Sequence, residues 1–193
     1  MSRELPNRAP PMGRRLWIAA VLAPALAVLP GDASSQTADP AETLGGTWRL
    51  AGSRAEAEAT VDAAVDRAVD AMSYFVRAIA RPRLREGTSI DDRIELLFEP
   101  EGRLRVRFSG RDGRSEYVTT LGRTESRVRA DGSRIRVTQR LHEDGSLEQV
   151  FQTDGGTRWY VYRPTSSGAL TLDVTTDSDR MPEAMRFRLS YRR

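Results

Sequence analysis

The stretch "LGGTWRLAGSRAEAE", Leu44 to Glu58, places a short strand directly before the start of a helix. The segment "GTWRLAG", Gly46 to Gly52, reads as the strand. Ser53 and Glu56 then form a capping box, because the hydroxyl and the carboxylate can each bond a free backbone N–H in the first helical turn. The chain is therefore predicted to make one strand, leave it for a helix, and lay down its other strands afterwards.

A single amphipathic helix is expected over residues 54–81. Its apolar residues are spaced alternately by four and three positions, which places them on one stripe: Val61, Val65, Ala68, Met72, Phe75 and Ile79. The pair Arg81-Pro82 is predicted to end the helix, because proline restricts the residue before it. A stripe this apolar must pack against another part of the chain.

From Asp92 onward the apolar period changes from 3.6 to two, which is typical of strands. In "RLRVRFS", residues 103–109, Leu104, Val106 and Phe108 point one way and the arginines the other. Strands are expected at 93–99, 103–109, 115–121, 124–130, 134–141, 147–153, 157–163, 170–176 and 185–192. Hairpin turns with glycine at a positive φ are indicated at Asp112-Gly113, Asp131-Gly132, Asp144-Gly145 and Asp154-Gly155.

Short connections make consecutive strands antiparallel neighbours. A flat sheet of this size would leave two long open edges. The sequence therefore predicts a mainly β fold: an antiparallel up-and-down barrel, or a strongly curled sheet, of about ten strands with one long helix after the first strand.

This organisation resembles the calycin barrels, and among them the intracellular fatty-acid-binding proteins more than the true lipocalins. The resemblance rests on "GTWRL", Gly46 to Leu50, and on the order of strand, helical lid and about nine further strands. It covers roughly Leu44 to Arg193. The resemblance implies a barrel domain over residues 44–193 in which the helix lies across an open end. A helix packed on the outer wall of a solid barrel is the alternative.

Three features depart from the family pattern. The family lid is two short helices, whereas one long helix is expected here. The family is typically cytosolic, whereas we expect this chain to be exported. The last strand of the family often holds a ligand carboxylate with Arg-x-Tyr, and here the corresponding stretch is Leu189-Ser190-Tyr191, in which only the tyrosine matches.

Residues 1–35 have the three parts of a signal peptide. Arg14 and Arg15 precede the apolar run "LWIAAVLAPALAVL", and small residues at Ala33 and Ser35 suit a cleavage after Ser35. The run is interrupted by Pro24 and is short for a membrane span of about 20 residues. We expect residues 36–43 to be a linker and the mature chain to be periplasmic or secreted, without a transmembrane span, by either the general or the twin-arginine route.

The composition points away from nucleic acid as a partner. All 30 basic residues are arginine, yet 27 acidic residues are interspersed with them and the net charge is only +3. The absence of cysteine excludes disulfides and thiolate chemistry. The single histidine, His142, lies in a predicted turn and cannot build a histidine-rich metal site. No catalytic motif, cofactor motif or metal site is indicated, so a protein that is not an enzyme is expected.

What remains is an apolar interior rich in large residues. As candidate ligand-binding residues we take Phe108, Phe151, Trp159 and Tyr191, with Arg158 and Tyr160 as polar groups that could orient a ligand. Arg158 and Tyr160 lie on the face of their strand opposite to Trp159, and strand parity alone leaves open which face is interior.

Two functions follow from this pattern. The first is an exported barrel that binds a small apolar or lipid-like molecule. The second is an envelope interaction protein with a solid barrel core and a protein or membrane-surface partner. An interior void of roughly several hundred cubic ångströms favours the first function, and continuous packing favours the second.

Overall fold

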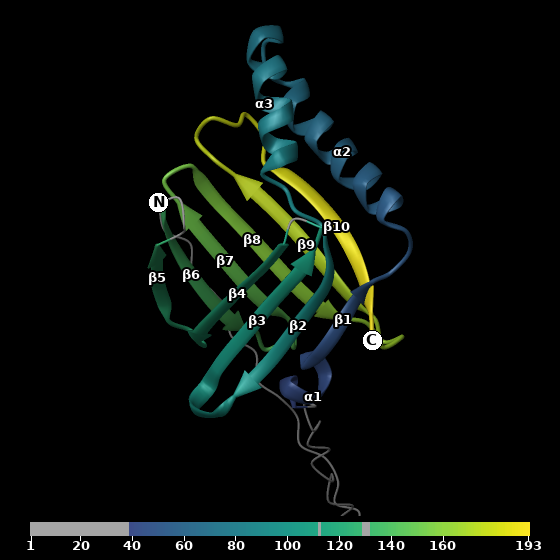
Figure 1. Ribbon diagram of the computed structural model, residues 1–193, viewed down its shortest axis with the longest axis vertical. Helices are drawn as coiled ribbons and strands as arrows, with labels where there is room; N and C mark the ends of the chain where they lie inside the picture. Colours follow the sequence, from purple (N-terminus) through teal and green to yellow (C-terminus); the bar gives the residue numbers. More distant parts are fainter. Residues whose placement is uncertain (1–38, 112, 129–131) are drawn as a thin grey trace, which may run out of the picture. The chain divides into compact units, whose positions relative to one another are not determined.

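The computed structural model describes residues 39–193 apart from residues 112 and 129–131 (Figure 1). The predicted signal peptide and the cleavage site after Ser35 lie outside the described residues. The predicted linker 36–43 is partly wrong, because Pro40–Leu44 form a short helix, α1. Asp39 caps this helix by accepting a hydrogen bond from the Ala41 N–H at 2.9 Å.

Ten antiparallel strands form one sheet that curls into a nearly closed barrel, which confirms the predicted fold class (Figure 1). Their spatial order is β4-β3-β2-β1-β10-β9-β8-β7-β6-β5, so β1 bridges the two halves of the sheet. The strands are β1 (Gly46–Leu50), β2 (Asp91–Glu99), β3 (Arg103–Gly110), β4 (Gly113–Thr120), β5 (Thr124–Val128), β6 (Arg134–Leu141), β7 (Leu147–Thr153), β8 (Gly156–Pro164), β9 (Leu170–Asp177) and β10 (Met185–Arg192). A single turn of 3-10 helix, Pro100–Gly102, joins β2 to β3.

The glycine turns follow the predicted positions with one shift. Gly113, Gly132 and Gly145 have positive φ, as expected for tight hairpins. At the β7–β8 turn the positive φ falls on Gly156, at 139°, rather than on the predicted Gly155. A Cβ on Gly156 would also collide with the carbonyl oxygen of Asp177 at the end of β9, so this turn needs glycine for both reasons.

The predicted single helix 54–81 is wrong, because the segment forms two helices, α2 (Arg54–Asp70) and α3 (Tyr74–Glu86). The chain turns at Ala71–Ser73, where Ser73 has an extended backbone with φ −61° and ψ 154°. The predicted end at Arg81-Pro82 is also wrong, since α3 continues through Pro82 to Glu86. The segment after β1 therefore has two helices, as in the lid of the resembled family. The single long helix expected as a departure from that family is not present.

The break divides the predicted apolar stripe into a buried part and an exposed part. Val61, Val65, Ala68 and Met72 are buried as α2 packs against β10. Phe75 and Ile79 are 81% and 59% exposed, because the turn before α3 carries them away from the barrel. The capping box at the start of α2 is present, and the Ser53 N–H holds the pKa of the Glu56 carboxyl below its ordinary value.

Three ion pairs join α3 to α2 along the antiparallel helix pair. They are Arg77–Asp70 at 3.6 Å, Arg81–Asp66 at 2.7 Å and Arg85–Asp62 at 2.5 Å. Both partners recur every four residues, so the pairs form a ladder along one side of each helix. Since α3 has no fully buried residue, this ladder is a main part of what holds it to α2.

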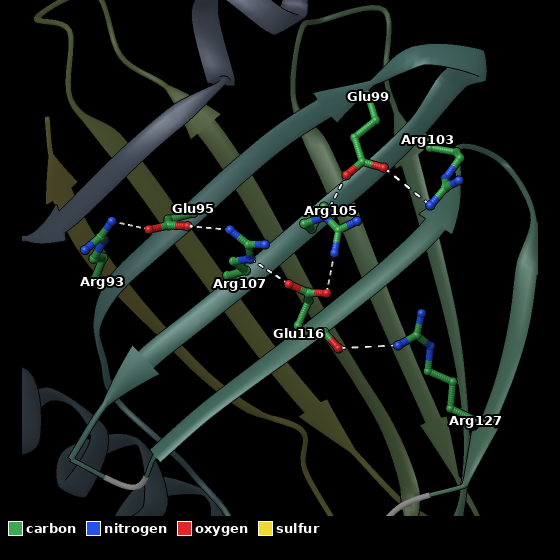
Figure 2. A network of polar contacts seen from close by, with 8 residues as sticks. All are labelled: Arg93, Glu95, Glu99, Arg103, Arg105, Arg107, Glu116 and Arg127. Atoms are coloured by element: carbon green, nitrogen blue, oxygen red, sulfur yellow. Dashed lines mark hydrogen bonds and ion pairs between the residues drawn. The ribbon is translucent and has the colours of Figure 1, made fainter.

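Several outward-facing arginines of the strands pair with acidic residues. On β2, β3 and β4 the charges alternate in sign across the sheet (Figure 2). Glu116 accepts from Arg107 at 2.6 Å and pairs with Arg105, and its pKa is lowered chiefly by the bond from Arg107. Exposed pairs of this kind add little stability each, but they keep one charge sign from accumulating.

The barrel is not closed by backbone pairing, because β4 and β5 are the two ends of the sheet. Side chains of β5 cross the gap instead. Arg127 donates to the carbonyls of Val118 at 2.7 Å and Glu116 at 3.4 Å, the second of which is drawn in Figure 2. Glu125 accepts from the Thr120 N–H at 3.1 Å. These contacts occupy backbone groups that a neighbouring strand would otherwise pair.

The end of the barrel that holds α1 lies opposite to the α2–α3 hairpin (Figure 1). We call this region the packed end, and its core includes the fully buried side chains of Leu104, Leu147, Tyr162 and Leu170. The Trp48 indole N–H donates to the Leu44 carbonyl at 2.8 Å. Arg193 lies over the Trp48 ring at 4.8 Å and donates to three carbonyls at the end of α1, which ties the last strand to the first helix.

Candidate functional site

A cavity of about 470 Å³ occupies the other end of the barrel interior. It opens between the end of α3, the β7–β8 turn and the β9–β10 loop. Leu84 and Gly87 contribute its helical side, so the hairpin borders the cavity mouth. This volume lies in the range of small-molecule pockets, and it is the kind of void expected of a binding barrel.

Four aromatic side chains line this cavity and contact one another in a closed cycle. Phe108, Tyr117, Phe151 and Tyr160 come from β3, β4, β7 and β8. Their ring centroids are 5.0 to 6.1 Å apart and every contact is edge-to-face. We call these four residues the aromatic cluster. Edge-to-face contacts place the positive ring edge against a neighbouring ring face, so the cluster forms a stable apolar surface.

Arg158 is the basic side chain on the cavity wall among the described residues. Its Nε donates to the Thr176 hydroxyl at 3.1 Å and its Nη2 donates to the Gly87 carbonyl at 2.8 Å. A guanidinium has five N–H donors, so these two bonds fix its orientation and leave further donors available. Asp91 and Asp177 also line the cavity, which gives its rim polar character of both signs.

The tyrosines of the interior are kept in the neutral form. Burial raises the pKa of the Tyr160 hydroxyl, and nearby Arg158 opposes that shift only in part. Burial raises the pKa of Tyr162 well above its ordinary value. Their hydroxyls are therefore hydrogen-bonding groups rather than anions across the physiological pH range.

The structure places four of the six predicted site residues together. Phe108, Phe151, Arg158 and Tyr160 all line the cavity. The parity question is thereby answered, because the face of β8 that carries Arg158 and Tyr160 is interior.

The other two predicted residues lie elsewhere. Trp159 alternates with Tyr160 and therefore points outward, where it borders a separate hollow beside the β7–β8 turn. Tyr191 is fully buried in the core and donates to the Asp91 carbonyl at 3.1 Å, but it does not line the cavity. Both are aromatic residues of strands, and the residue type reveals neither the outward parity of Trp159 nor the packing around Tyr191.

Sequence reasoning missed Tyr117 and Leu84. Tyr117 belongs to β4, whose other inward residues Ser115 and Thr119 are polar, so no apolar alternation marked that face. Leu84 lies beyond Pro82, where the helix was expected to have ended. The continuation of α3 past the proline is thus what brings a helical side chain to the cavity.

The described part of the chain has neither a membrane-spanning helix nor a clustered metal site. None of its helices has the length and apolar character needed to cross a membrane. Within the same residues, no group of three or more histidine or acidic side chains is arranged to hold a metal ion.

Solved structures share this fold. The chain is similar to fatty-acid-binding protein 1 of Echinococcus granulosus, with 13% identity, a TM-score of 0.50, and coverage of 79% of this chain and 98% of that one. It is similar to lipid binding protein 8 of Caenorhabditis elegans, with 8% identity, a TM-score of 0.52, and coverage of 79% and 96%. It is also similar to the fluorescent protein UnaG, with 17% identity, a TM-score of 0.50, and coverage of 79% and 98%.

No protein-family model matches the sequence. No curated protein matches it either. At sequence identities of 8% to 17%, the similarity to these solved structures establishes the fold alone. The described barrel and its helix pair after the first strand thus have the calycin-like fold of these solved structures.

Proposed function

We propose that this protein is an exported, non-enzymatic barrel that binds a small apolar or lipid-like molecule in the cavity at the hairpin end. The observation that carries the proposal is the cavity of about 470 Å³ with the aromatic cluster as an apolar wall. Burial of apolar ligand surface there supplies about 25 cal/mol per Å². The fold shared with proteins named for fatty-acid and lipid binding supports the same proposal.

Arg158 contacts the polar end of the ligand at the rim in this proposal. Two hydrogen bonds already hold its guanidinium in place, so little side-chain entropy is lost when a ligand binds. The packed end presents no such charge, since the buried side chains there are uncharged. The ligand therefore lies with its apolar part on the aromatic cluster and a polar group toward the mouth.

The test uses protein stripped of bound lipid and titrated with the fluorescent probe N-phenyl-naphthylamine. We expect saturable binding that changes little with salt, because apolar burial rather than charge pairing drives it. Phe151→Ala should weaken binding about tenfold by removing one wall of the cavity. Phe75→Ala is the matched control, because that ring is exposed on α3 and lies outside the cavity.

A second candidate function is an envelope protein that binds a protein partner through its surface. The exposed side chains of Tyr74, Phe75, Val76 and Ile79 on α3 favour it. The variants Phe151→Ala and Phe75→Ala distinguish the two candidate functions. Loss of partner binding in Phe75→Ala, with no probe binding by the wild type, would replace the carrier function by the interaction function.

A further inference from the structure

A layer of polar side chains lies directly beneath the aromatic cluster, inside the barrel. On β4, β7 and β8 each cluster residue is followed, two positions deeper on the same strand face, by a polar one. Thr119 lies below Tyr117, Gln149 below Phe151, and Tyr162 below Tyr160. Two residues along a strand correspond to about 6.6 Å, so the layers are one side chain apart. Gln139 on β6 is the cross-strand partner of Gln149 and completes the layer.

Only some of the hydrogen-bonding groups in this polar layer have a partner within the protein. The Thr119 hydroxyl donates to Gln139 Oε1 at 2.7 Å, and the Tyr162 hydroxyl donates to Gln149 Oε1 at 3.1 Å. Both glutamines are 0% exposed, and the Nε2 group of each has no hydrogen-bond partner. Exchanging the amide oxygen and nitrogen would leave the same number of polar atoms unpaired, because each side chain has a single protein partner. The layer therefore holds unused hydrogen-bonding capacity.

A buried N–H donor without a partner costs folding free energy. Two such donors on the cross-strand neighbours Gln139 and Gln149 therefore suggest that a bound molecule supplies the missing acceptors. Carbonyl, ester, carboxylate and ether oxygens are acceptors that suit an amide N–H. The route to the layer leads from the cavity, whose wall is the aromatic cluster. Tyr117 and Phe151 of this wall are only partly buried and border the open space of the cavity.

We propose that Gln139 and Gln149 form a second, polar subsite of the barrel, which receives a hydrogen-bond-acceptor end of the bound molecule. This inference rests on the proposed function. The expected ligand is then an apolar molecule that carries an acceptor oxygen at the end lying deepest in the barrel. The ligand then spans from the Gln139–Gln149 pair, past the aromatic cluster, to Arg158 at the rim.

The test compares methyl nonyl ketone with undecane, which have equally long carbon chains, by displacement of N-phenyl-naphthylamine. The quantity of interest is the ratio of the ketone affinity to the alkane affinity, because the hydration of the two probes cancels when wild type and variant are compared. We expect this ratio to fall about fivefold in Gln149→Leu, and similarly in Gln139→Leu, as one hydrogen bond is lost. The matched control is Gln152→Leu, which makes the same change on the opposite face of β7.

A second readout is the infrared carbonyl stretch of isotope-labelled ketone. We expect a lower frequency in the wild type than in Gln149→Leu, because a hydrogen bond weakens the C=O bond. An unchanged affinity ratio in both folded variants, or an unshifted carbonyl band, overturns the polar subsite while N-phenyl-naphthylamine binding still supports the barrel function. Failure of that probe to bind the wild type overturns the proposed function and this inference with it.

Discussion

The two ends of the barrel interior differ, although the same strands build both. On β8, Tyr160 lines a cavity, whereas Tyr162 is fully buried and bonded to Gln149. The packed end is held by apolar burial. The cavity end is bordered by turns, by a helix pair joined through ion pairs, and by Arg158. Strand β8 thus contributes to a solid core and to an open site at positions only two residues apart.

The largest effect is expected from truncating the packed end. Leu104→Ala should lower the free energy of unfolding by about 2–5 kcal/mol, because a fully buried leucine leaves a cavity that its neighbours cannot fill. Leu84→Ala, on the cavity wall, should cost only about 1 kcal/mol, since that side chain already borders open space. Urea unfolding of both variants measures the difference. Equal losses would mean that the two ends do not differ in packing.

A smaller effect is expected from the glycines of two turns. Gly156→Ala at the cavity rim should cost about 2 kcal/mol, because a positive φ and the collision with the Asp177 carbonyl act together. Gly145→Ala at the packed end has only the positive φ, at 77°, and should cost about 1 kcal/mol. The difference between the melting temperatures of the two variants measures the cost of the contact with the Asp177 carbonyl. If Gly156→Ala were the milder change, the rim would be freer to move than its geometry implies.

The smallest effect is expected in the helix ladder. Asp66→Asn breaks the pair with Arg81 and should change global stability by only about 0.5 kcal/mol, because the pair is exposed. Its local effect should be faster amide hydrogen exchange in α3, which high salt reproduces in the wild type. Glu143→Gln, an exposed change in the β6–β7 turn, is the control. Unchanged exchange in α3 would show that contacts other than the ladder hold this helix.

The sheet could be predicted from the sequence because its signals are local. Alternation in "RLRVRFS" and the Asp-Gly turns placed the ten strands to within two residues. The helix break could not, because the spacing from Val61 to Ile79 stays periodic across Ser73. Periodicity reports a continuous face but not a turn that redirects it, and so Phe75 was placed on the buried stripe.

The site was predicted in part for a similar reason. Four of the six candidate residues line the cavity, and the signal for them was aromatic residues and an arginine on strands. Trp159 and Tyr160 differ only by parity, and the closure of the whole barrel decides which of them faces inward. Gln149 was overlooked as a polar residue, although it shares its strand face with Leu147 and Phe151, and that was the available signal.

The side chains that cross the β4–β5 gap have a consequence for the protein in a crowded solution. An unpaired strand edge is a template on which another chain can add a strand and begin aggregation. Here Arg127 caps two carbonyls of β4 and Glu125 caps an N–H of the same strand. The barrel can thus remain unsealed while these three backbone groups of the β4 edge are already bonded within the chain.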